Sequence, residues 1–161
     1  MGRFFRMSNR FNKSKPCDFG LVEMQKDSCA VDPEDGSQWL PCSLFDFGWG
    51  EENGFYKVPL PKYRELLKIV LESEDYDDVY GAAAIILEKY PDDLLSSCEE
   101  LFSSEHSDIK FKLTSIFQLQ LCINRSKIQG KTYREILDDT NRWHAIGKAV
   151  SQGTVNSKIT W

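Results

Sequence analysis

The chain has 161 residues, of which 41% are hydrophobic and 28% are charged, and its formal net charge is −5 at pH 7. These values are typical of one ordinary globular domain with its own core, and they exclude a disordered chain. The negative charge argues against a general nucleic-acid-binding protein, because such proteins normally present a basic surface to phosphates.

Basic residues are concentrated at the N-terminus. Residues 1–17 contain no acidic side chain, and their basic residues are Arg3, Arg6, Arg10, Lys13 and Lys15. Two interpretations stay open. The segment is either a flexible basic arm, or an arm that folds back on the acidic body of the protein or touches a phosphate-bearing partner.

The N-terminal sequence and the lack of a long apolar run predict a cytoplasmic protein. No apolar signal-peptide core follows Phe4 and Phe5, and no apolar run approaches the roughly 20 residues that a transmembrane helix needs. The cysteines are scattered without close pairs, at Cys17, Cys29, Cys42, Cys98 and Cys122. In the cytosol we expect them to be reduced thiols.

Residues 18–58 predict a small antiparallel β element. Short runs with strand character occur at 19–24, 28–31, 39–45 and 55–58, and the turn signal DPEDGS occupies residues 32–37. Pro41 has no backbone N–H, so it favours an edge position for its strand. Aromatic residues are dense in this part: Trp39, Phe47, Trp49, Phe55 and Tyr56. We expect them to form its core with the helices, or in part to anchor an interface.

Residues 59–90 predict two helices. In the first, the residues at i, i+3, i+4, i+7 and i+8 are the apolar Tyr63, Leu66, Leu67, Val70 and Leu71, and Pro61 suits its first turn. The second, YDDVYGAAAIILEKY, begins with acids that complement the helix dipole. One of its faces carries Tyr76, Val79, Tyr80, Ala83, Leu87 and Tyr90.

The second helix is apolar on nearly every side, which is typical of a helix buried on more than one side. Gly81 inside it costs roughly 1 kcal/mol relative to alanine, so we expect close packing at Gly81 to compensate. Pro91 should end this helix, and Asp92 should cap the next one.

The rest of the chain predicts three more helices. Leu94, Leu95, Cys98, Leu101 and Phe102 share one face of the third helix. A fourth, broadly apolar helix should follow Ser107 or Asp108 and extend over 109–126. The pattern Thr132-x-x-Glu135 is a capping box and should open a fifth helix, whose apolar face carries Tyr133, Ile136, Leu137, Thr140, Trp143 and Val150.

The stretch YGAAAIILEKYPDDLLSSCEELF with the following IKFKLTSIFQLQLCIN resembles a pair of HEAT-type repeats over residues 62–126. The resemblance implies antiparallel helical hairpins stacked side by side. The predicted fold class is therefore mainly α, with about five helices and a small N-terminal antiparallel β element. The predicted organisation is a single domain with a basic arm (1–17), a β-rich element (18–58) and a helical body (59–161).

The whole chain also resembles, more faintly, the small immunity proteins of bacterial toxin–immunity gene pairs. The resemblance lies in the short β-rich N-terminal part, the helical body and the ending GKTYREILDDTNRWHAIGKAV at 130–150. It implies a cytosolic inhibitor that binds the catalytic domain of its cognate toxin, often a nuclease, and blocks the active site.

Residues suited to catalysis or metal binding form no known motif. His106 lies between Ser104 and Asp108 in a polar joint, and His144 follows Trp143 on the last helix. Zinc, P-loop and calcium-loop patterns are missing from the sequence. We therefore expect no enzymatic activity, no metal and no cofactor, although paired carboxylates could still form an unrecognised catalytic site.

The acidic clusters are better suited to a binding surface, because an acidic inhibitor can match a positively charged nuclease site and gain association rate. The predicted partner-binding residues are Asp46, Trp49, Glu51, Glu52, Asp75, Asp77, Asp78, Asp92 and Asp93. The predicted partner is a protein, the cognate toxin domain, with no direct nucleic-acid or membrane binding. The alternative is an α-solenoid-like adaptor that binds a protein or peptide.

Overall fold

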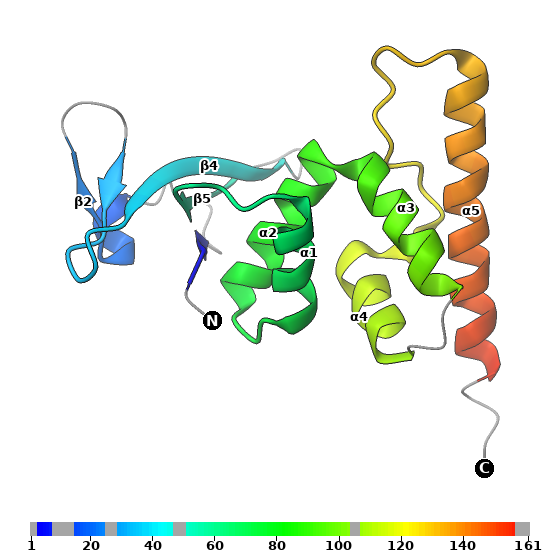
Figure 1. The fold of residues 1–161 in the computed structure, drawn as a ribbon, viewed down its shortest axis with the longest axis horizontal. Helices are drawn as coiled ribbons and strands as arrows, with labels where there is room; N and C mark the ends of the chain where they lie inside the picture. The colour runs from blue at the N-terminus through cyan, green and yellow to red at the C-terminus, as the bar shows by residue number, and fades with distance from the viewer. Residues whose placement is uncertain (1–2, 8–14, 25–28, 47–50, 104–106, 157–161) are drawn as a thin grey trace. The chain divides into compact units, whose positions relative to one another are not determined.

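The computed structural model describes residues 3–7, 15–24, 29–46, 51–103 and 107–156. Within these ranges it is mainly helical, with five α-helices and one small antiparallel sheet (Figure 1), which confirms the predicted fold class at that level. The chain divides into two compact units, residues 1–85 and 86–161. The division falls inside a helix, whereas the sequence pattern suggested a change of structure near residue 58.

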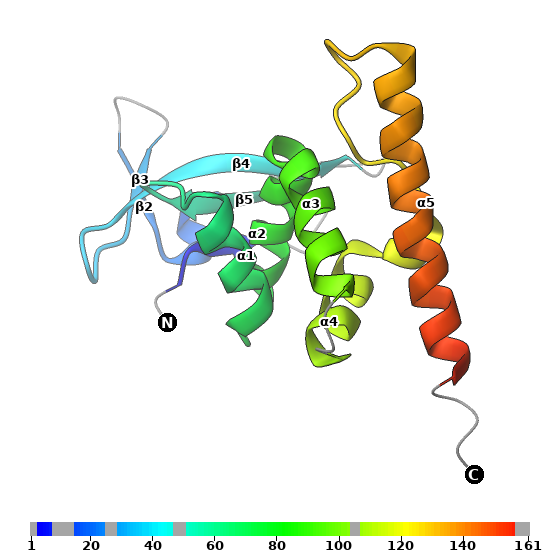
Figure 2. The same cartoon turned by 45° about the vertical axis from the view of Figure 1, so that its right-hand side comes forward.

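The first unit contains the sheet. Its strand order is β1 (Phe5–Met7), β5 (Glu51–Lys57), β4 (Gln38–Asp46), β3 (Ala30–Val31) and β2 (Val22–Glu23), and neighbouring strands are antiparallel. Figure 2 shows β4 and β5 lying side by side as the long central pair. A short 3-10 helix, η1 (Pro16–Phe19), precedes β2.

Residues 3–7 fold back on the acidic body, which confirms the second interpretation of the basic arm for this part of it. β1 pairs with β5, so that Phe5 faces Tyr56 and Met7 faces Gly54 in register. Phe5 is completely buried. No strand was predicted here, because a run of three residues with Arg6 at its centre has no clear period of its own.

Pro41 lies in β4, an internal strand of the sheet, yet its position meets the physical requirement for proline. β3 pairs with β4 only at Gln38 and Trp39, whereas β5 pairs with β4 from Trp39 onward. At Pro41 the strand therefore has one hydrogen-bonded neighbour, and the missing N–H leaves no partner unsatisfied.

The sheet has its own small core. Leu21, Ala30, Trp39 and Phe55 are buried together, and Phe19 packs edge-to-face on Phe55 with ring centroids 5.5 Å apart. These residues confirm the predicted core role of Trp39 and Phe55, whereas Phe47 and Trp49 lie outside the described residues. The Arg6 guanidinium lies 4.6 Å from the centre of the Trp39 ring and also pairs with Asp32.

Two helices follow the sheet, α1 (Tyr63–Glu72) and α2 (Tyr76–Lys89). Every residue from Gly81 to Ile86 is buried, as expected for a helix that is apolar on nearly every side. A Cβ atom at Gly81 would lie 2.4 Å from Cγ of Phe5. Glycine is thus required here, and the predicted close packing at Gly81 is with the N-terminal strand.

The second unit contains α3 (Pro91–Phe102), α4 (Ser107–Phe117), the 3-10 helix η2 (Leu119–Leu121) and α5 (Tyr133–Asn156). α3 and α5 lie side by side (Figures 1 and 2). Pro91 occupies the first position of α3, with Tyr90 as its N-cap, so the prediction that Asp92 caps this helix is wrong. No helix among the described residues combines the length and apolar character that crossing a bilayer requires.

The fourth helix is shorter than predicted, because α4 ends at Phe117. Gln118 and Cys122, on either side of η2, adopt left-handed backbone conformations with φ of 49° and 53°. Arg125 donates hydrogen bonds to the carbonyls of Phe117 and Gln118, which satisfies the open end of the helix. The turn then packs on α5 at Gly147, where a Cβ would lie 2.3 Å from Sγ of Cys122.

α5 begins at the predicted capping box. The Thr132 hydroxyl accepts a hydrogen bond from the N–H of Glu135, and the Glu135 carboxylate accepts one from the N–H of Thr132. Trp143 and Val150 are buried, as predicted for the apolar face. Tyr133 and Leu137 were assigned to the same face, and that assignment is wrong, because Tyr133 is 80% exposed and Leu137 is also exposed.

Candidate partner-binding surfaces

The first candidate surface is the start of α2 in the first unit. The Asp75 carboxylate accepts hydrogen bonds from the N–H groups of Asp77 and Asp78, at 2.9 and 3.3 Å. These amides belong to the first helical turn, which has no partners within the helix. Asp75 therefore caps α2, and the acids of the first turn also match the positive end of the helix dipole.

The Arg3 side chain forms ion pairs with two of these carboxylates. Its Nη2 is 2.7 Å from Oδ2 of Asp77, and its Nε is 3.6 Å from Oδ2 of Asp75. The Arg3 side chain is 50% exposed. The side chains of Asp75 and Asp77 are 41% and 18% exposed, so solvent reaches both ion pairs from the arginine side. Each pair therefore contributes about 1 kcal/mol at most to the free energy of unfolding.

Asp78 has a different role from its neighbours. It is only 3% exposed, and its Oδ1 accepts hydrogen bonds from the backbone N–H groups of Phe4 and Phe5 at 2.7 and 2.8 Å. Burial raises the pKa of this carboxyl, and the two hydrogen bonds only partly offset that effect. Asp78 was predicted to contact a partner, but in this structure its carboxylate holds the N-terminal strand.

Two exposed tyrosines complete this surface. Tyr76 and Tyr80 are 55% and 44% exposed, and their rings stack with centroids 4.2 Å apart at a tilt of 30°. They are one helical turn apart, which places them on the same face of α2. We name the set Asp75, Tyr76, Asp77 and Tyr80 the α2 surface. It presents paired aromatic rings next to carboxylates.

The tyrosines were missed as site residues, because the apolar spacing of α2 assigned them to the same face as Val79 and Ala83. The signal that could have found them is their position. Both lie in the first two turns, and Asp75 and Asp77 flank Tyr76 directly in the sequence. Tyrosine beside acids at the start of a helix is suited to partial exposure.

The predicted residues of the β hairpin are only partly described. Asp46 and Glu51 face each other in the register of β4 and β5, and Glu52 faces Phe45. Trp49 lies outside the described residues. The backbone thus places three predicted acids at the end of the hairpin, 51–52 opposite 45–46.

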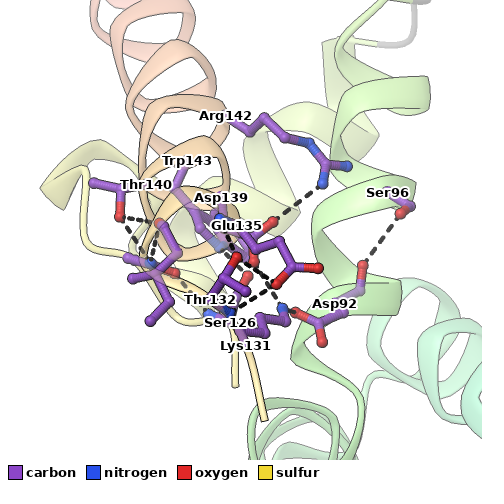
Figure 3. Close-up of polar contacts among 12 residues, drawn as sticks. Asp92, Ser96, Ser126, Lys131, Thr132, Glu135, Asp139, Thr140, Arg142 and Trp143 are labelled. Carbon is purple, nitrogen blue, oxygen red and sulfur yellow. Dashed lines mark hydrogen bonds and ion pairs between the residues drawn. The ribbon is translucent and has the colours of Figure 1, made fainter. Parts of the chain in front are cut away.

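The second unit places Asp92 in a network between α3 and α5 (Figure 3). Lys131 Nζ is 2.8 Å from Oδ1 of Asp92 and 2.7 Å from Oδ2 of Asp139. Burial raises the pKa of Asp92, but hydrogen bonds from Lys131 and Ser126 outweigh it and the net pKa is lowered. Asp93, the next predicted residue, is exposed on the same helix.

The same network continues along α5. Arg142 donates from Nε and Nη2 to the two carboxylate oxygens of Glu99, at 2.8 and 2.7 Å, which is a bidentate pair. This pairing lowers the pKa of Glu99. Arg142 also lies 3.3 Å from the buried Asp139. The network connects α3 to α5, and Asp92 serves that connection (Figure 3).

Polar contacts between α5 and the segment after η2 complete the connection. The indole N–H of Trp143 donates to the Ser126 hydroxyl at 3.1 Å, and the Asn124 amide donates to Thr140 at 2.8 Å. Trp143 and Ser126 are labelled in Figure 3, and both pairs attach the segment after η2 to α5. They position the chain that leads to Lys131.

Groups suited to catalysis are dispersed in the part of the chain that the structure describes. His144 is exposed on α5, and Ser104 and His106 lie outside the described residues. The described residues contain no cluster of three histidine, cysteine or acidic side chains able to hold a metal ion. Burial raises the pKa of the Cys98 thiol to about 12. A thiol with that pKa is not a nucleophile at neutral pH.

Comparison of the chain with protein-family models, with curated proteins and with solved structures gave no match.

Proposed function

We propose that this protein is a non-enzymatic binding protein and that its partner is a protein with a basic surface. The observation that carries this proposal is the α2 surface, where two exposed, stacked tyrosines and the carboxylates of Asp75 and Asp77 occur together at the start of α2. Tyrosine is enriched among the residues that dominate binding energy at interfaces. Adjacent acids add attraction for a positively charged partner.

The stacked geometry supports this use of the tyrosines. The two rings restrict each other, so little side-chain freedom is lost when a partner covers them. Their exposed area would be removed from water in a complex, and carboxylates at the rim would increase the rate of association. Binding of this kind should weaken as the salt concentration rises.

The narrower proposal is that the protein is a cytoplasmic immunity protein and that its partner is a bacterial toxin domain. A nuclease toxin would present the basic surface, because its active site holds phosphates. A HEAT-like arrangement of helices is part of the same proposal. Of the helices within residues 62–126, α3 and α4 contact each other in one compact unit, as a helical hairpin would, and this contact supports the proposal. The acids of the β hairpin would extend the binding surface.

Co-expression tests the immunity proposal. The product of the gene immediately upstream is expressed in a bacterial host with and without this protein, and growth and co-purification are measured. We expect growth to stop without the protein and to resume with it, together with a stable complex. An upstream product that is harmless, or one that stays lethal in the presence of this protein, would rule out immunity.

Substitutions then test the surface. The double variant Tyr76→Ala, Tyr80→Ala should weaken the complex roughly 30-fold or more, since a tyrosine hot spot contributes about 2 kcal/mol or more. Its control is Phe111→Ala, because Phe111 is a 78% exposed aromatic residue of the second unit. Equal loss of binding in both variants would show that the α2 surface is not the specific binding site for the partner.

The second candidate function is an adaptor that binds a protein or peptide through the second unit. The specific observation in its favour is a set of large exposed apolar side chains there, namely Phe111, Leu121, Ile123, Ile128, Tyr133 and Leu137. Tyr133→Ala distinguishes the two functions. Loss of partner binding in Tyr133→Ala, with normal binding by the variant of Tyr76 and Tyr80, would favour the adaptor.

A further inference from the structure

The N-terminal segment has a firmly held part and a loosely held end. Phe5 is completely buried, Met7 is buried, and the N–H groups of Phe4 and Phe5 donate to the buried carboxylate of Asp78. Arg3 comes immediately before this part, and half of its side chain is in solvent. Because exposed ion pairs are weak, the Arg3 side chain can leave Asp75 and Asp77 while β1 stays paired with β5.

The position of Arg3 also shows what the α2 surface accepts. A guanidinium there meets Asp77 at 2.7 Å and Asp75 at 3.6 Å, on either side of Tyr76 in the sequence. Guanidinium groups pair with carboxylates in a fixed fork geometry and also stack on aromatic rings. The exposed rings of Tyr76 and Tyr80 therefore suit the same chemical group.

We propose that Arg3 is an internal competitor for the partner of the α2 surface: an arginine from a basic segment of the partner protein replaces Arg3 on Asp75 and Asp77. This inference rests on the proposed function and specifies the chemistry of the partner. It also assigns a regulatory role to Arg3, which covers the two carboxylates until the partner arrives. If Arg3 had only a structural role, it would stay paired with Asp75 and Asp77 in the complex.

A peptide-binding experiment on the full chain tests the competition. Fluorescence anisotropy of a labelled hexa-arginine peptide is measured at low salt against wild type, Arg3→Ala and Arg134→Ala. Arg134 is an exposed arginine of α5 in the second unit, so its loss changes the net charge equally. We expect Arg3→Ala to bind the peptide about two- to five-fold more tightly than wild type, and Arg134→Ala to match wild type.

Acidic variants locate the peptide. Asp77→Asn in the Arg3→Ala background should remove the gain in affinity, whereas Asp138→Asn, an exposed acid of α5, should keep it. Equal affinities of Arg3→Ala and Arg134→Ala, or no peptide binding by any variant, would overturn the proposal. Arg3 is an exposed residue, so an unchanged melting temperature of Arg3→Ala should accompany the measurement.

The outcome is separable from that of the proposed function. Successful rescue of growth with a negative peptide assay would overturn competition by Arg3 and leave the immunity proposal standing. A positive peptide assay with failed rescue would overturn immunity and leave the arginine-binding surface standing.

Discussion

The two compact units use their acidic residues in different ways. In the first unit, acids of the first turn of α2 hold the N-terminal segment through backbone N–H groups and Arg3. In the second unit, Lys131 pairs with Asp92 and Asp139 (Figure 3). Arg142 pairs with Glu99, and these contacts connect two helices.

The difference shows that clusters of like charge in a sequence do not have one meaning. Asp78 is buried against backbone donors, so its ionised form has lost much of its hydration. Glu99 stays partly exposed and gains a bidentate arginine, so its ionised form is favoured. As pH rises, the contribution of Asp78 to the free energy of unfolding should therefore decrease, whereas that of Glu99 should increase. Substitutions that remove these two interactions should show the same opposite dependence on pH.

The largest effect is expected from Phe5→Ala, for which Phe111→Ala is the exposed control. Phe5→Ala should lower the free energy of unfolding by about 3–5 kcal/mol, because it empties a fully buried site between β1 and Gly81. Phe111→Ala, at an exposed site, should change it by about 0.5 kcal/mol or less. Urea denaturation measures both, and hydrogen exchange should place the loss from Phe5→Ala in the first unit. Similar losses for the two variants would contradict the burial of Phe5.

Asp78 should give the next largest effect. Asp78→Ala leaves the N–H groups of Phe4 and Phe5 without an acceptor and should cost about 2 kcal/mol or more. Asp78→Asn keeps an acceptor oxygen and is its matched control. Because the pKa of Asp78 is raised in the folded state, wild type loses stability from this group as pH rises above about 4. Denaturation at several pH values should thus show the free energy of unfolding of Asp78→Asn increasing relative to that of wild type as pH rises. A difference between the two proteins that stays constant with pH would contradict the raised pKa of Asp78.

In the second unit, Gly147→Ala should destabilise by about 1–3 kcal/mol through overpacking. The added Cβ would lie 2.3 Å from Sγ of Cys122 and 2.9 Å from the carbonyl oxygen of Leu119. Because the backbone at Leu119 cannot move aside as a flexible side chain can, the steric clash should be relieved only in part. Ala145→Ser, at an exposed position of the same helix, is the control and should shift the melting temperature little. A neutral Gly147→Ala would mean that the turn at 118–122 does not pack on α5.

The smallest effect is expected from Arg142→Ala. The pair with Glu99 is substantially exposed, so its loss should cost less than about 1 kcal/mol at pH 7. Arginine lowers the pKa of Glu99, so the pair stabilises the folded state above the ordinary glutamate pKa and stops doing so as pH falls. The difference between wild type and Arg142→Ala should therefore shrink in acid. A difference that persists after Glu99 is protonated would assign the effect to the contact with Asp139 or to packing of the arginine stem.

Much of the helical structure could be predicted from local signals. The amphipathic spacing of α1, the apolar run of α2 and the capping box of α5 each depend on residues a few positions apart. The β element was also predicted, because turn residues and β-branched or aromatic runs alternate there. Burial of Leu94, Leu95 and Cys98 followed from the same spacing.

The candidate surface could be predicted only in part. Asp75 and Asp77 were among the expected residues, since they belong to a cluster of acids at a predicted helix start. Whether such an acid faces solvent or holds a distant segment depends on what packs against it. The sequence also suggested burial for Tyr76 and Tyr80, because periodicity ranks them with their apolar neighbours and cannot show where the neighbouring elements end.

The sequence by itself determined where most helices begin and that a small antiparallel sheet precedes them, since these depend on local hydrogen bonding and spacing. The strand at residues 5–7 depends on tertiary contacts, because it forms by pairing with β5 and its start is held by the Asp78 carboxylate, more than 70 residues away. Tertiary contacts likewise set the end of α4 at Phe117. Arg125 donates a hydrogen bond to the Phe117 carbonyl, and Gly147, which lacks a side chain, leaves room for a turn that no local signal predicts. Long-range contacts of this kind arise only when the chain has folded, and they outweigh the weak preferences of short segments.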